Sequence, residues 1–165
     1  MDKKVEFIKS LGIAVANGFD PLIVYTHAYN ESDNFRAIIG ECNALGLKVP
    51  MIYLKTHKPP FGGWDGAIVR GVMTHEQGKV TEFLPQDFMD FLTFNKQTEY
   101  YCFHIARVFK SAWRVRISPV EYFALLQKFG YFTDKTGAIT LIKLYADFNA
   151  NGERQKILDI LNQQK

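Results

Sequence analysis

The sequence lacks the short motifs that mark the most familiar enzyme sites. It contains no GxxxxGKS/T phosphate-binding loop, no GxGxxG, no HExxH, no GxSxG and no CxxC pair. Each of these motifs supplies a phosphate cradle, metal ligands or a nucleophile in a fixed local geometry. Their absence argues against the common nucleotide-binding, zinc-protease and serine-hydrolase chemistries.

Cysteine is scarce, and apolar residues form no long run. The 2 cysteines, Cys42 and Cys102, lie far apart among apolar neighbours, which is typical of reduced, buried thiols in the cytoplasm. Near the N-terminus, Glu6 and Lys9 interrupt the apolar residues, so we expect no signal peptide. No apolar stretch approaches the roughly 20 residues that cross a bilayer. We therefore expect a cytoplasmic protein without a membrane partner.

Neither sign of charge dominates, and the residues that bind metals are not clustered. The formal net charge is +3, which permits an acidic partner without requiring one. The 4 histidines are scattered, and no two have the spacing that places both on one face of a helix. We expect no metal and no cofactor. A magnesium-dependent nuclease site built from Asp65, Glu76, Glu82 and Lys79 is a minor alternative, because the spacing matches no nuclease motif.

Aromatic and basic residues are abundant in the second half of the chain. Residues 98–116 carry four cations and five large aromatic rings against one acid. Cations attract phosphates, and flat rings stack on unpaired bases. The leading hypothesis is therefore a small nucleic-acid-binding or nucleic-acid-processing accessory protein with DNA or RNA as its partner, although the same rings also fit a hydrophobic core. The residues predicted to bind nucleic acid are Arg107, Lys110, Arg114, Arg116, Tyr101 and Trp113.

A second hypothesis is a protein-binding module or inhibitor that acts through exposed aromatic and arginine side chains. Residues 58–66, KPPFGGWDG, hold two prolines and three glycines, which predicts an ordered loop. Such a loop can display Trp64 beside Lys58 as an anchor for another protein. Alternatively, Trp64 folds back onto the sheet.

A third hypothesis is a small enzyme that acts on a small or phosphorylated substrate. His27, Glu31 and His57 follow predicted strands. Open α/β sheets bind their ligands at the ends of strands, so we take these three residues as candidate catalytic residues of one pocket.

The N-terminal half is predicted to alternate helices and strands. Apolar residues recur at helical spacing over residues 2–16 and again over residues 33–45. Short apolar runs at residues 22–26 and 49–55 are rich in strand-forming residues. Strand, helix and strand in about 35 residues have the size of a βαβ unit, which we predict within residues 1–57.

The C-terminal half is predicted to be rich in hairpins. Strands at residues 67–73 and 79–84 are expected to pair across a turn at residues 76–78. Residues 113–117 alternate as a strand does, and residues 131–133 and 138–145 flank a polar turn as a second hairpin. Residues 100–108 fit either a strand or a helix, and residues 86–94 are ambiguous. Ser118, Pro119 and Glu121 mark the start of a helix, and a final amphipathic helix is expected at residues 153–162.

Together these elements predict a mixed α/β or α+β fold in one domain over residues 1–165. Its mixed sheet has a βαβ-like N-terminal half and a hairpin-rich, aromatic C-terminal half at residues 66–165. A helix followed by a hairpin over residues 118–145 also has the order of a winged-helix module, with Lys128 and Lys135 placed to meet phosphates.

Overall fold

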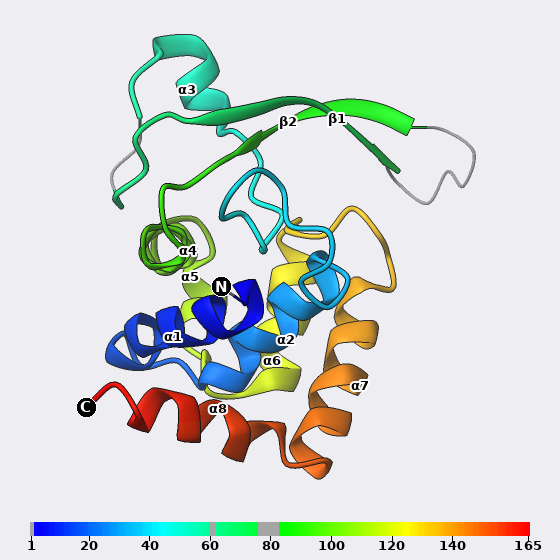
Figure 1. Ribbon diagram of the computed structural model, residues 1–165. Helices are drawn as coiled ribbons and strands as arrows, with labels where there is room; N and C mark the ends of the chain where they lie inside the picture. Colours follow the sequence, from blue (N-terminus) through cyan, green and yellow to red (C-terminus); the bar gives the residue numbers. More distant parts are fainter. Residues whose placement is uncertain (1, 60–61, 76–82) are drawn as a thin grey trace.

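The protein folds into a body of helices with a β-hairpin across one end (Figure 1). A computed structural model describes residues 2–59, 62–75 and 83–165, and describes side chains outside residues 73–85. Over these residues the chain forms eight helices and a single two-stranded antiparallel hairpin, so the fold is mainly α-helical and the predicted α/β or α+β mixed sheet is wrong. The elements are α1 (Lys3–Ala16), α2 (Pro21–Glu31), α3 (Met51–Thr56), β1 (Ile68–His75), β2 (Phe83–Met89), α4 (Phe94–Val108), α5 (Lys110–Trp113), α6 (Pro119–Lys128), α7 (Gly137–Ala150) and α8 (Glu153–Asn162).

Helix α2 forms the centre of the body. Asp20 caps its start by accepting a hydrogen bond from the Leu22 amide at 3.0 Å, and Pro21 occupies its first turn. Every residue from Leu22 to Ala28 is buried. A helix covered on all sides is apolar all round, so it lacks the periodic pattern that reveals a surface helix. The predicted strand at residues 22–26 is wrong for this reason.

Residues 33–45, predicted to be a helix, form an irregular segment. Asp33, Asn34 and Phe35 have positive φ angles of 49°, 56° and 61°, and a left-handed backbone cannot continue a right-handed helix. The Ser32 hydroxyl accepts a hydrogen bond from the Phe35 amide at 2.9 Å, which satisfies the backbone locally. Residues 49–55, predicted to be a strand, contribute to α3 instead. The predicted βαβ-like unit over residues 1–57 is therefore wrong.

Polar side chains hold the irregular segment in place. The buried Asn43 amide donates to the Leu47 and Met89 carbonyls at 2.9 and 2.8 Å, and its oxygen accepts from the Leu47 amide at 3.1 Å. The side-chain oxygen of Gln97, on α4, accepts from the Ala44 amide at 2.7 Å. These bonds satisfy buried backbone groups that regular secondary structure would otherwise pair.

An antiparallel hairpin lies in the region of the first predicted one, but the predicted bounds of its second strand are wrong, because β2 runs through Phe83–Met89, past the expected end at residue 84. Strands β1 and β2 pair antiparallel, with Ile68 opposite Met89, and the register shifts between Val69 and Val72. The expected turn at residues 76–78 lies outside the described residues. The hairpin and α3 lie together on one side of the helical body (Figure 1).

The other predicted strands of the C-terminal half are wrong. Residues 100–108 belong to α4, residues 113–117 cover the end of α5 and the turn after it, and residues 138–145 belong to α7. Ala138, Leu141 and Tyr145 recur at helical spacing and are the buried residues of α7, so packing overrides their local preference for a strand. The hairpin-rich half and the winged-helix order are wrong with them. Helices α1, α6 and α8 match the predicted helices.

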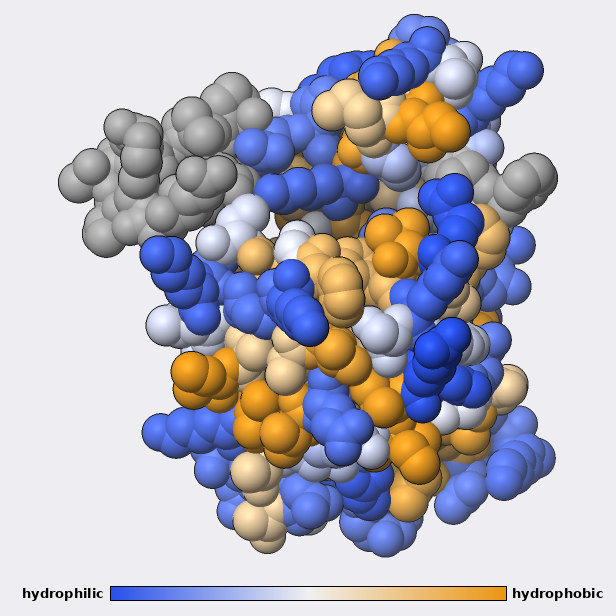
Figure 2. Space-filling model, turned by 180° about the vertical axis from the view of Figure 1, so that it is seen from behind, coloured by the Kyte–Doolittle hydropathy of each residue, from blue (hydrophilic) through white to orange (hydrophobic). Residues whose placement is uncertain are grey.

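The aromatic cluster of the second half is core. Tyr100, Tyr101 and Phe109 are at most 7% exposed. On the face in Figure 2, apolar surface gathers over the middle of the helical body and at the α3 end, where Met51 and Ile52 are exposed. Burial of the rings thus accounts for the composition that suggested a stacking surface.

Asp90 ties the irregular segment to the end of β2. Its carboxylate accepts hydrogen bonds from the amides of Glu41, Cys42 and Phe91 at 3.0, 3.1 and 2.8 Å. We expect Asp90→Ala to lower the free energy of unfolding by about 2 kcal/mol in urea denaturation, because these amides lose a charged acceptor. Asp147→Ala, at an exposed position on α7, should cost less than about 0.5 kcal/mol. Equal costs for the two variants would contradict the anchoring role of Asp90.

Candidate functional site

A cavity of about 370 Å³ lies where α2 and α7 meet the irregular segment and β2. We call it the acid cavity, because two carboxylates line it. Its volume falls in the usual range of small-molecule sites. It is lined by Asn30, Glu31, Gly46, Lys48, Phe88, Tyr131, Phe132, Thr133, Asp134, Gly137, Thr140 and Leu141.

Glu31 is the last residue of α2, so the buried helix fixes where its carboxyl group lies. The side chain is 31% exposed. A Cβ atom on Gly46 would lie 2.8 Å from Glu31 Oε2, and Gly46 has a φ of +63°. Glycine at this position therefore leaves room for the carboxyl group and also supplies the left-handed backbone of the turn.

His27 lies one turn before Glu31 and is fully buried. Its Nδ1 is 2.8 Å from the hydroxyl of Tyr101, which is 2.6 Å from the hydroxyl of Tyr122. Its Nε2 lies 3.7 Å from Glu31 Oε1 and has no hydrogen-bond partner among the described residues. Burial raises the pKa of Tyr101 and of Tyr122 well above the usual value, so both hydroxyls stay neutral. A chain of polar groups thus runs from the core to the carboxyl group of Glu31.

Asp134 is the second carboxylate of the acid cavity. It lies in the loop before α7 and accepts hydrogen bonds from the amide and the hydroxyl of Thr136, both at 2.9 Å. These bonds hold the pKa of Asp134 below its usual range, so this carboxylate is ionised at neutral pH. In the same loop, Tyr131 and Phe132 place their rings 4.9 and 5.6 Å from the ring of His27. The acid cavity therefore combines a fixed negative charge with aromatic walls.

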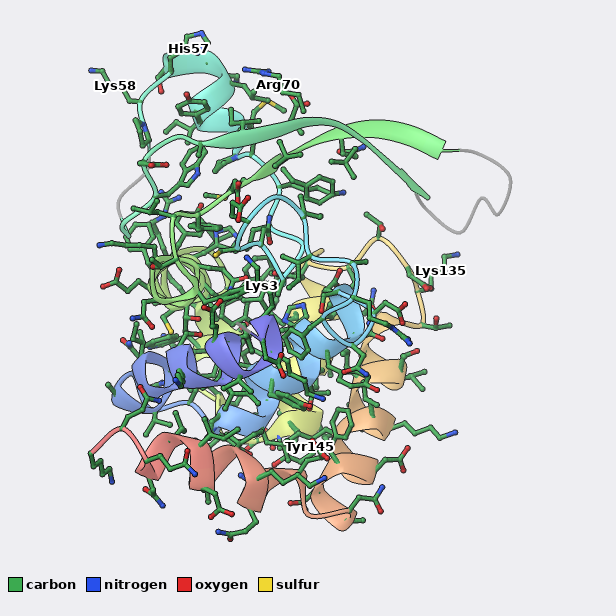
Figure 3. The ribbon with its side chains drawn as sticks, viewed as in Figure 1. Lys3, His57, Lys58, Arg70, Lys135 and Tyr145 are labelled. Carbon is green, nitrogen blue, oxygen red and sulfur yellow. The ribbon has the colours of Figure 1, made fainter. Side chains whose placement is uncertain are left out.

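Two of the three candidate catalytic residues lie together. His27 and Glu31 are neighbours on α2, whereas His57 is exposed at the end of α3, with a left-handed φ of 56°. Figure 3 shows His57 at the outer end of α3, on the far side of the hairpin from α2. His27 and Glu31 lie on a helix and follow no strand. Both residues lie at or next to a cavity, but the argument from strand ends that led to this prediction is wrong. Their catalytic roles stay predictions.

The residues predicted to bind nucleic acid are largely engaged in packing or spread over the surface. Tyr101 is fully buried, and Trp113 meets Phe19 edge-on at 5.6 Å. Arg116 donates to the carbonyls of Asn17 and Trp113 at 2.7 Å each and stacks over the Trp113 ring at 4.1 Å. The predicted nucleic-acid-binding residues that are exposed are Arg107, Lys110 and Arg114.

The predicted anchor for a protein partner faces inward. Trp64 is 4% exposed, donates its indole N–H to the Ala67 carbonyl at 3.0 Å, and lies 4.8 Å from the ring of Tyr53 on α3. Lys58 is exposed at the end of α3 (Figure 3). The loop therefore covers α3 with its tryptophan and does not display it.

Several solved structures share the fold. A peptidoglycan hydrolase mutant from Sphingomonas sp. A1 is 16% identical over 92% of this chain and 95% of that chain, with a TM-score of 0.71. The glycoside hydrolase domain of FlgJ from Salmonella typhimurium is 18% identical over 99% of both chains, with a TM-score of 0.63. The catalytic domain of the autolysin Auto from Listeria monocytogenes is 20% identical over 90% of this chain and 86% of that chain, with a TM-score of 0.60. The fold is the lysozyme-like fold of glycoside hydrolases. No protein-family model and no curated protein sequence matches the chain.

This likeness contradicts the leading hypothesis. The prediction of a nucleic-acid-binding or nucleic-acid-processing protein is wrong, as are the expected DNA, RNA and protein partners. The alternative of a small enzyme agrees better with the fold.

Within the described ranges, no three side chains of His, Cys, Asp or Glu converge as metal ligands. No described helix has both the length and the apolarity to cross a membrane.

Part of the site has no signal in the sequence. The pattern at residues 134–137 predicts the turn of a hairpin, and nothing in it places Asp134 in the same cavity as Glu31. Gly46 is predicted only to end a helix. Both positions depend on contacts between segments far apart in the chain, so local patterns cannot reveal them.

His104, on α4, provides a pH test of the packing beside the site. Burial, aided by the charge of Arg107, lowers the pKa of His104 to about 4. Below pH about 6.5 the unfolded chain binds a proton at His104, whereas the folded chain does not bind it until the pH approaches 4. The free energy of unfolding is therefore undiminished by His104 above pH about 6.5, and it decreases as the pH falls towards 4. We expect a loss of about 2 kcal/mol between pH 7 and pH 5 in urea denaturation, and a smaller loss in His104→Asn. His57→Asn, at an exposed position, should follow the wild type; a His104→Asn curve parallel to the wild-type curve would contradict the account.

Proposed function

We propose that the protein is a glycoside hydrolase that cleaves the glycan strands of peptidoglycan, with Glu31 as proton donor. The observation that carries the proposal is the position of Glu31, a partly exposed carboxyl group fixed by a buried helix in a cavity with aromatic walls. The fold supports it, because the similar structures are a peptidoglycan hydrolase, a glycoside hydrolase domain and an autolysin catalytic domain.

The cytoplasmic location expected from the sequence stays a prediction, which cell fractionation tests.

Cleavage of a glycosidic bond requires a proton on the oxygen that leaves. Protonated Glu31 gives its proton to that oxygen as the bond from the sugar carbon to the oxygen breaks. The remaining sugar takes on positive charge. Water then adds to the sugar carbon and releases a proton, which returns the site to the protonation state that it had before the reaction. Glu31 suits the first step because its carboxyl group faces the acid cavity, where the bond would lie.

The second step needs a carboxylate that activates water or stabilises the positive charge. Asp134 is the other carboxylate among the described residues that line the acid cavity, and its hydrogen bonds from Thr136 favour the ionised form. Asp134 therefore fits this role. The two carboxyl groups begin the reaction in opposite protonation states: Glu31 carries the proton that it donates, and Asp134 is ionised.

His27 positions Glu31 in this scheme. A Tyr101 hydroxyl that donates to His27 Nδ1 places the imidazole proton on Nε2, the atom that faces Glu31 Oε1 at 3.7 Å. An N–H group in that direction stabilises the carboxylate that forms when Glu31 gives up its proton. In this scheme, the hydrogen bonds from Tyr122 through Tyr101 determine that Nε2, the ring nitrogen nearest to Glu31, carries the imidazole proton.

The first test replaces the proposed donor. We expect Glu31→Gln to reduce the release of new reducing ends from purified peptidoglycan by at least about 100-fold, because general acid catalysis is lost. Circular dichroism should show an unchanged fold, since the amide has nearly the same shape. Glu121→Gln, at an exposed position on α6, is the matched control and should keep wild-type activity.

The same assay distinguishes the reaction and assigns the second acid. New reducing ends without free stem peptides indicate cleavage of the glycan. Asp134→Asn tests the assigned carboxylate, and Glu76→Gln and Glu82→Gln test the acids between β1 and β2 in the sequence. Wild-type turnover in Glu31→Gln, or no release by the wild-type protein, would overturn the proposal.

A second test addresses the hydrogen-bond chain. Tyr101→Phe removes the partner of His27 Nδ1, and one hydrogen bond of about 1 kcal/mol corresponds to roughly five- to tenfold in kcat. KM should change little, because Tyr101 lies in the core and does not reach the cavity. Tyr122→Phe leaves the Tyr101 hydroxyl beside His27 and should lower kcat less. A larger effect of Tyr122→Phe, or a change confined to KM, would contradict the positioning role.

A further inference from the structure

Helix α3 presents apolar side chains to solvent at one end of the molecule. The helix contains no buried residue. Tyr53 holds it to the loop that follows, with its ring 4.8 Å from the ring of Trp64. Met51, Ile52 and Leu54 are 65%, 54% and 45% exposed. Single apolar residues are ordinary on a protein surface, but three within four successive positions form a patch.

The same helix leads into a basic segment. Residues 47–64 carry three lysines and no acid. Two of these lysines, Lys55 and Lys58, are exposed, as is His57 between them. Figure 3 shows His57 and Lys58 at the outer end of α3, away from the helical body. We call residues 51–58 the α3 tip, which combines apolar and cationic side chains with no acid among them.

This combination suits an anionic bilayer surface better than another protein. Lysine is depleted in the cores of protein interfaces. Segments that lie on membranes instead place lysines beside apolar side chains, so that the apolar groups enter the acyl boundary and the ammonium groups meet lipid phosphates. The long stems of Lys55 and Lys58 let their charges stay at the headgroups while the apolar side chains lie deeper. The α3 tip also lies at an extremity of the molecule, where a flat surface can reach it (Figure 1).

We propose that the α3 tip docks the protein on an anionic lipid bilayer. Met51, Ile52 and Leu54 enter the headgroup boundary, and Lys55 and Lys58 bind lipid phosphates. The acid cavity has no lining residue from α3, so this docking surface is separate from the proposed site of glycan cleavage. The expectation of no membrane partner rests on the lack of a run long enough to span a bilayer, and a segment that lies on the surface needs no such run.

The test is co-sedimentation of the full chain with vesicles of two compositions. One kind contains phosphatidylcholine alone, and the other an equimolar mixture of phosphatidylcholine and phosphatidylglycerol. We expect binding to the anionic vesicles that weakens as salt is raised, and little binding to the neutral vesicles. Lys55→Gln with Lys58→Gln should weaken binding to the anionic vesicles about 20- to 30-fold, because each cation near an anionic surface contributes about fivefold.

A second pair of substitutions tests the insertion of apolar side chains. Met51→Ser with Ile52→Ser removes apolar area that would enter the bilayer, and should weaken binding to the anionic vesicles at least about tenfold. The matched control is Ile117→Ser with Val120→Ser, near the start of α6, where the side chains are 68% and 57% exposed. This control should bind as the wild type does.

A matched control for charge is Lys110→Gln with Lys143→Gln. Both lysines are exposed on the helical body, one on α5 and one on α7. This variant loses the same net charge as the lysine pair of the α3 tip, and should bind anionic vesicles within about twofold of the wild type. All four double variants should melt within about two degrees of the wild type, because the changed side chains are exposed.

Several results would overturn the inference. The wild-type protein could leave anionic vesicles unbound or bind both kinds equally, or Lys55→Gln with Lys58→Gln could bind as tightly as the wild type. A dimer in light scattering that dissociates in Met51→Ser with Ile52→Ser, without vesicle binding, would assign the α3 tip to a contact between two copies of the chain. Salt-sensitive binding to purified peptidoglycan but not to vesicles, lost in the lysine pair, would assign the α3 tip to an anionic polymer.

Discussion

The complete burial of α2 is the constraint on which the rest of the structure depends. A helix that is buried from Leu22 to Ala28, and mostly apolar over these residues, has no stable place except at the centre of the body, covered on every side. Asp20 both caps this helix and binds Arg154 and Tyr145, which ties its start to α7 and α8. With its start held and its sides covered, α2 can end only at the acid cavity. The position of Glu31 is therefore a consequence of core packing.

The irregular segment after α2 completes the site by a different physical means. Side chains such as Asn43, Gln97 and Asp90 satisfy its backbone, so the segment is ordered without being helical or extended. This freedom lets Gly46 pass close to the carboxyl group of Glu31 and lets the same stretch line the acid cavity. Loops held by rigid elements are common places for binding and catalysis.

The sequence predicted the elements whose signals are local. Helices α1 and α8 expose one face and show helical periodicity, and α6 begins at Pro119, after its N-cap Ser118. The first strand of the hairpin lies close to its predicted bounds, whereas the second strand ends later than predicted. It failed for α2, which has no exposed face, and for residues 33–45, where three left-handed residues interrupt an apolar pattern. In the site, His27 and Glu31 were identified as candidates, but Asp134 was not, because its relation to Glu31 exists only after α7 packs against α2. The aromatic segment misled because composition does not distinguish a core from a stacking surface.

The central claim is that the scissile bond lies beside Glu31 in the acid cavity, and a crystal structure of Glu31→Gln with a bound peptidoglycan glycan fragment tests it most directly. The account predicts a glycosidic oxygen within about 3 Å of the side chain at position 31, since proton transfer requires hydrogen-bond contact. A fragment bound elsewhere on the protein, with the acid cavity empty, would contradict it.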